Sequence, residues 1–105
     1  QGIATLDAVA CDDGPDVLAD LVDARVVEIF GRGVFPVVLG GDHSVAIGAI
    51  RAASRLHEGG SVLQIDAHAD TREEYQGSRF NHACVMARID EICDIVQVGI
   101  RSMDA

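Results

Sequence analysis

The sequence is short of basic residues, and it has no long apolar run. Only 8 Lys and Arg stand against 17 Asp and Glu, which gives a net charge of −9. Because nucleic acids and anionic membranes attract basic surfaces, this balance argues against either of them as a partner. No apolar stretch approaches the ~20 residues of a membrane span. No basic region followed by an apolar stretch marks a signal peptide at the N-terminus.

Cysteine is also scarce, with Cys11, Cys84 and Cys93 in 105 residues. The number is odd and no C-x-x-C pair occurs, so neither a disulfide framework nor a typical zinc site is indicated. We expect reduced thiols and a cytoplasmic protein. Cys84 and Cys93 lie among apolar residues and are expected to fill space in the core.

The remaining pattern predicts an α/β fold. Hydrophobic residues make up 49% of the chain and charged residues 24%, as in a globular domain. Helices expected over about 15–31, 44–57 and 82–92 alternate with strands expected over about 34–39, 61–66 and 95–100. Residues 1–13 show no regular pattern. The strands are almost continuously apolar, which is typical of a parallel β-sheet that is buried on both faces.

Three parallel strands make a small sheet with long apolar edges. Such edges favour association, and the last expected strand ends only five residues before the sequence does. We therefore expect residues 1–105 to form a single partial domain whose C-terminal part is absent. We also expect a homo-oligomer when the protein is full length.

The segment Asp66-Ala67-His68-Ala69-Asp70 follows the apolar run at residues 62–65. In extended backbone, residues i, i+2 and i+4 share a face, so Asp66, His68 and Asp70 are expected to point the same way. Two carboxylates and an imidazole suit manganese, iron or zinc better than calcium. Charged residues directly after a buried strand are costly unless they are paired or bind a ligand.

A second polar cluster follows the preceding apolar run. Residues 36–39 lead into Gly40-Gly41-Asp42-His43-Ser44, where the glycines allow a sharp turn and Asp42 or Ser44 can cap a helix. In parallel α/β sheets, sites form at the carboxyl ends of the strands. His43 is therefore expected to share one crevice with the three side chains of the 66–70 segment.

These two motifs together resemble the ureohydrolase family, which includes arginase and agmatinase. They occur in the family's order, 23 positions separate His43 from Asp66, and each follows an apolar strand. Asn81-His82-Ala83 and the segment from Val98 to Asp104 are also similar to the agmatinase branch. The likeness covers most of residues 34–104.

The resemblance implies a three-layer α/β sandwich around a parallel sheet and a manganese-dependent hydrolase. Its reaction would cleave a guanidino compound, with agmatine the first candidate, to urea and an amine through a hydroxide that bridges two manganese ions. The substrate would thus be a small cation. By the same resemblance, His43 and Asp70 would bind one metal ion, His68 the other, and Asp66 both. His82 would lie beside the substrate and carry a proton to the leaving amine.

The chain departs from the family pattern at one point. The family completes its site with two aspartates from a later Asp-x-Asp motif, and Asp104 is too early and lacks a partner. The charge balance agrees, since two divalent ions and two carboxylates leave a positive site, which repels a guanidinium whose charge persists at any working pH. We therefore expect this chain alone to be inactive.

Several alternatives stay open. His82 could be an ordinary residue of a first helical turn, and Asp42 could either orient His43 or cap a helix. Glu73, Glu74 and Tyr75 could face a substrate tail or belong to a solvated loop. At the level of function, the rivals are another binuclear metallohydrolase, such as a phosphoesterase, a zinc deacetylase, and an inactive fragment or partner-binding subunit.

Overall fold

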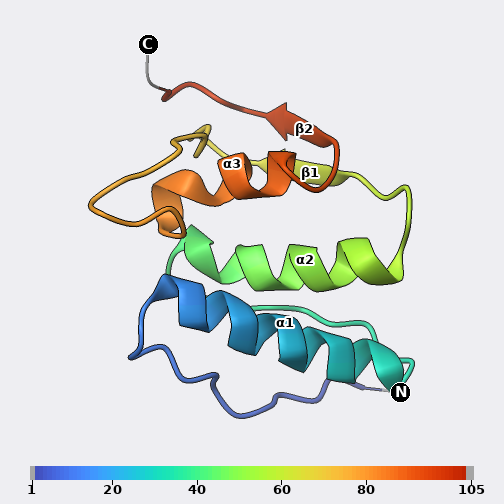
Figure 1. The fold of residues 1–105 in the computed structure, drawn as a ribbon. Coiled ribbons are helices and arrows are strands. Elements are labelled where there is room, and N and C mark those ends of the chain that lie inside the picture. Colours follow the sequence, from blue (N-terminus) through green and yellow to red (C-terminus); the bar gives the residue numbers. More distant parts are fainter. Residues whose placement is uncertain (1, 104–105) are drawn as a thin grey trace.

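A computed structural model describes residues 2–103, so Asp104 lies outside the described part of the chain. Three α-helices, two 3₁₀ turns and two strands follow one another (Figure 1). Their bounds are α1 Pro15–Gly31, η1 His43–Val45, α2 Ala46–Leu56, β1 Val62–Ile65, η2 His82–Cys84, α3 Val85–Asp90 and β2 Ile95–Val98. The three expected helices are therefore present, and residues 2–13 have no helix or strand, as expected.

Helix α1 begins where the sequence predicts, and no side chain caps its N-terminus. Gly14 is the N-cap, and Pro15 starts the first turn. One face carries the buried Ala19, Val22 and Val26, which pack toward α2. Gly48 of α2 lies directly against this face, because a Cβ built on it would come within 2.1 Å of the Ala19 carbonyl oxygen. A glycine at this point lets the two helices approach closely.

The strands β1 and β2 pair in parallel, with Leu63 opposite Val96 and Gln64 opposite Gln97. Successive side chains alternate between the two faces of the sheet. Ile95 packs with α3 residues in the main core, on the face that the helices cover. The other face carries Leu63, Ile65, Val96 and Val98, which are 62, 79, 57 and 49% exposed. We expected both faces of the sheet to be buried. Among residues 2–103, no segment covers the second face.

The strand expected over about 34–39 is absent from the sheet, and that prediction was wrong. Residues 34–40 have no regular structure, and no backbone hydrogen bond joins residues 35–40 to another described segment. Phe35 is 84% and Leu39 90% exposed. An extended segment becomes a strand only when a neighbouring strand accepts and donates its backbone hydrogen bonds. In the described chain, β1 and β2 pair with each other, and neither pairs with residues 34–39.

The helices stack on one side of the sheet in the order α3, α2 and α1 (Figure 1). The core between them consists of five fully buried side chains: Ala19, Ile47, Val85, Met86 and Ile89. Cys84 is also buried, as predicted, and Cys93 packs at the edge of this core. In the described part of the chain, no helix combines the length and apolar character needed to cross a membrane.

Candidate metal centre

His43 reaches the site from the short turn that precedes α2. The Asp42 carboxylate accepts hydrogen bonds from the backbone N–H and the hydroxyl of Ser44, at 2.8 and 2.5 Å, and so caps η1. The Ser44 hydroxyl holds the pKa of Asp42 below its ordinary value. Of the two roles considered for Asp42, the geometry shows capping. Gly40 is needed for close packing, because a Cβ there would lie 2.3 Å from Cγ2 of Val45.

Asp66 to Asp70 form a turn rather than a continuation of β1. Asp70 has a positive φ of 53°, which breaks the extended alternation that the sequence suggested. Its carbonyl oxygen accepts the backbone N–H of Met86 at 2.8 Å, so the start of α3 fixes the end of the turn. On the other side, Ala67 and Ala69 exchange backbone hydrogen bonds with residues 101 and 102 that follow β2. The turn is therefore held from two directions.

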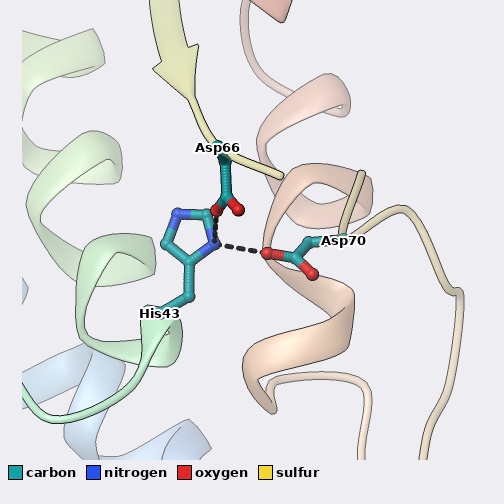
Figure 2. Close-up of side chains that lie close together, drawn as sticks. All are labelled: His43, Asp66 and Asp70. Atoms are coloured by element: carbon teal, nitrogen blue, oxygen red, sulfur yellow. Dashed lines mark hydrogen bonds and ion pairs between the residues drawn. The ribbon is translucent and has the colours of Figure 1, made fainter. Parts of the chain in front are cut away.

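Three of the predicted side chains meet in a tight group (Figure 2). Nδ1 of His43 lies 2.6 Å from Oδ2 of Asp70 and 3.7 Å from Oδ2 of Asp66. One ligand atom from each of the three lies within 4.8 Å of the other two. The side chains of His43, Asp66 and Asp70 are 26, 25 and 13% exposed. An imidazole and two carboxylates, brought together at partly buried positions, could hold a divalent metal ion.

His68 lies next to this group but outside it. Its Nδ1 is 3.1 Å from Oδ1 of Asp66, and its side chain is 66% exposed. The backbone N–H of His68 donates to the same oxygen at 2.9 Å. This N–H, followed by the His68 ring, holds the pKa of Asp66 below its ordinary value, while partial burial opposes the shift. Asp66 is therefore ionised at neutral pH, as a metal ligand must be.

The group opens into a cleft of about 450 Å³. His68 and His82 both line this cleft, so all four predicted metal ligands and the predicted proton carrier lie along it. The Asn81 side chain accepts the backbone N–H of Ala83 and caps η2, which begins at His82. The His82 ring packs edge-on against Tyr75, with 5.7 Å between the ring centroids. This packing gives His82 a defined place beside the tight group.

The loop at residues 71–78 divides into two parts. Tyr75 lines the cleft, as does Arg72, whose guanidinium lies 4.8 Å from the centre of the Tyr75 ring. Glu73 turns the other way and accepts a hydrogen bond of 2.6 Å from Arg88, whose side chain is 4% exposed. This ion pair holds the pKa of Glu73 below its ordinary value. Glu73 therefore anchors the loop to α3 and does not face the cleft.

Two glutamines near the site were not predicted from the sequence. Gln64 and Gln97 lie opposite each other in the sheet, and their amides contact the 66–70 turn. Their position in the sequence could have indicated them, because each is a polar residue inside an otherwise apolar strand. The buried amide of Gln64 needs hydrogen-bond partners, and the neighbouring turn offers them.

Comparisons with known proteins agree with this geometry. The model of the arginase family matches residues 2–105. An agmatinase from Pyrococcus horikoshii is 46% identical over 95 residues, which cover 90% of this chain and 31% of the relative. A guanidinobutyrase from Pseudomonas aeruginosa is 32% identical over a 115-residue alignment that covers 96% of this chain and 36% of the relative.

A solved structure supports the fold. The agmatine ureohydrolase of Thermoplasma volcanium superimposes with a TM-score of 0.78 at 35% identity, over 89% of this chain and 32% of that chain. The chain thus spans about a third of the length of these relatives. The expected α/β fold with a parallel sheet is confirmed, and it is incomplete here. The family match over residues 2–105 shows that this chain belongs to the arginase family of ureohydrolase enzymes.

Proposed function

We propose that the protein hydrolyses a guanidino compound to urea and an amine with the help of two manganese ions. The observation that carries this proposal is the tight group of His43, Asp66 and Asp70, which lines a cleft. The donor set fits the metal, because mixed carboxylate and imidazole ligands suit manganese. The family supports guanidino hydrolysis as the reaction class.

In this proposal, His43, Asp66 and Asp70 would hold one ion, and His68, beside Asp66, would help to hold the second. Divalent metal ions supply a nucleophile at neutral pH, because they lower the pKa of a coordinated water. The Asp66 carboxylate would be ready to bind metal, because the hydrogen bond from the His68 N–H lowers its pKa. A guanidinium carbon needs this help because its positive charge is delocalised.

His82 is proposed to supply the proton that the leaving amine requires. It lines the same cleft as the tight group, and its ring is braced by Tyr75. Histidine suits this task because its ordinary pKa lies near neutrality.

Residues 2–103 supply too few carboxylates for a cationic substrate. Two divalent ions carry four positive charges, and Asp66 and Asp70 offset two of them. The remaining positive charge would repel a guanidinium. We therefore propose that further carboxylates come from outside this sequence, in the two thirds of the relatives' length that it does not span.

Among guanidino compounds we propose agmatine first. The agmatinase is 46% identical over 90% of this chain, two N(1)-aminopropylagmatine ureohydrolases are 48 and 45% identical over 57 and 80% of it, and the guanidinobutyrase is 32% identical. The acidic excess of the chain also favours a small cation over an anion. Nucleic acid and membranes are not proposed as partners, and a homo-oligomer in the cytoplasm remains our expectation from the sequence alone.

The test is urea release by the whole protein that carries these residues, purified, stripped of metal and reloaded with Mn²⁺. We expect urea from agmatine only in the loaded sample. Phosphate release from phosphoesters or acetate release from acetylated amines, without urea, would favour the rival metallohydrolases. The isolated 105-residue chain is expected to bind Mn²⁺ weakly and to produce no urea, and robust turnover by it would contradict the charge argument.

A further inference from the structure

Two amide side chains connect the sheet to the candidate metal centre. Gln64 of β1 is 5% exposed, and Gln97 of β2 is its register partner. A buried amide without hydrogen bonds costs free energy, so each polar atom of Gln64 should have a partner. The partners lie in the neighbouring strand and in the 66–70 turn.

The partners fix the direction of the hydrogen bonds. Nε2 of Gln64 lies 3.0 Å from the His68 carbonyl oxygen, which can only accept, so the NH₂ group must face the turn. Oε1 of Gln64 is then left to accept from Nε2 of Gln97 at 2.6 Å. That same Nε2 also donates to the Ala69 carbonyl oxygen at 2.8 Å. The amides thus form a one-way relay from Gln97 through Gln64 to the turn.

The relay ends on a predicted metal ligand. Nε2 of Gln64 also donates to Oδ2 of Asp66 at 3.3 Å. This oxygen is the one that faces Nδ1 of His43, at 3.7 Å. Oδ1 of Asp66 meanwhile accepts the backbone N–H of His68. Hydrogen bonds therefore hold both carboxylate oxygens and fix the rotation of the group.

We infer that Gln64 and Gln97 are positioning residues that hold the 66–70 turn and the Asp66 carboxylate in the arrangement that binds metal. This inference rests on the proposed function. Backbone hydrogen bonds to residues 101 and 102 hold Ala67 and the Ala69 N–H, and the two glutamine amides are the donors to the His68 and Ala69 carbonyl groups. Residues that donate hydrogen bonds to metal ligands commonly tune the affinity for the metal.

The experiment is a Mn²⁺ titration of the whole protein, in which the electron paramagnetic resonance signal reports free Mn²⁺. Gln64→Met and Gln97→Met keep the length of the side chain and remove its donors. We expect each to weaken Mn²⁺ binding about 10-fold or more. The matched control is Gln76→Met, at an exposed loop position, and its affinity should equal that of the unaltered protein.

A third variant tests the direction of the relay. Gln97→Glu keeps size and polarity but cannot donate to Gln64 or to the Ala69 carbonyl group. To pair with it, the Gln64 amide must reverse and turn its oxygen toward Asp66 and His68. We expect a loss of affinity at least as large as for Gln97→Met.

Two results would overturn the inference. One is Mn²⁺ affinity within twofold of the control in all three variants. The other is loss of the fold in these variants, measured by circular dichroism, because the amides would then stabilise the sheet and not the site. Failure of the unaltered protein to bind Mn²⁺ would instead overturn the proposed function, and with it the role assigned to the two glutamines.

Discussion

Nδ1 of His43 lies 2.6 Å from Oδ2 of Asp70, although 27 positions separate the two residues in the sequence. The contact joins the entry of α2 to the turn that follows β1. Both residues are held independently, His43 by the capped turn at Asp42 and Asp70 by the start of α3. The two ligand atoms are therefore brought together by the fold and do not depend on each other for their position.

Asp70→Asn should weaken Mn²⁺ binding by more than ~10–100-fold, which is the loss typical when a residue that hydrogen-bonds to a metal ligand is changed. The change keeps the shape of the side chain but removes the charge that attracts the cation. The measurement is a Mn²⁺ titration of the whole protein. Asp20→Asn is the matched control, because Asp20 is a 78% exposed residue of α1. Equal affinities of the two variants would contradict the assignment of Asp70.

His82→Asn should lower kcat by ~10²–10⁴-fold and leave the metal content unchanged. The residue is proposed to move a proton and not to bind metal, so activity and metal loading should separate. His57→Asn is the control, since His57 packs against Phe30 at the far end of α2. An unchanged pH–rate profile in the His82 variant would leave His82 with a structural role only.

Gly48→Ala should destabilise the fold by ~1–3 kcal/mol, because the added methyl group meets the backbone of α1. The nearest atoms are the Ala19 carbonyl oxygen at 2.1 Å and the Asp23 nitrogen at 2.8 Å. Gly31→Ala provides the same substitution at a helical position with no heavy atom within 4 Å. It should be neutral or stabilise by up to ~1 kcal/mol. Chemical denaturation of both variants decides the matter, and equal stabilities would contradict the close approach of α1 and α2.

Asp23→Asn should make the stability less dependent on pH in the acid range. The guanidinium of Arg55 holds the pKa of Asp23 below its ordinary value of 3.8. Because the pKa is lower in the folded state, the stabilisation is present above pH 3.8 and is lost as pH falls through the folded value. Arg55 is half-exposed, so we expect a contribution of ~0.2–1 kcal/mol. Denaturation at pH 6 and pH 3 measures it, and an unchanged difference between the two would contradict the pairing.

Part of the site could be predicted from the sequence. The proximity of His43 to the segment that begins at Asp66 was predicted from the rule that the carboxyl ends of parallel strands meet at one edge, although residues 34–39 form no strand in the described chain. The shared face of Asp66, His68 and Asp70 was predicted from extended geometry, but the chain turns at Asp70, which has a positive φ, and the His68 side chain is 66% exposed. No local pattern shows that turn, because the tertiary hydrogen bond to Met86 fixes it.

Other features depend on contacts that a single sequence does not display. The segment at 34–39 has the composition of a strand, yet pairing decides whether it becomes one. Gly40 was expected for a turn, whereas the packing of Val45 explains it. The relay from Gln97 to Gln64 follows from register, which depends on how β1 and β2 align.

The most direct test of the account is anomalous diffraction at the manganese edge from crystals of the whole protein grown with Mn²⁺. We predict an anomalous peak bonded to His43, Asp66 and Asp70, with a second one on the His68 side of Asp66. Manganese bound elsewhere, or no peak among these side chains at full loading, would contradict the claim that this group is the metal centre.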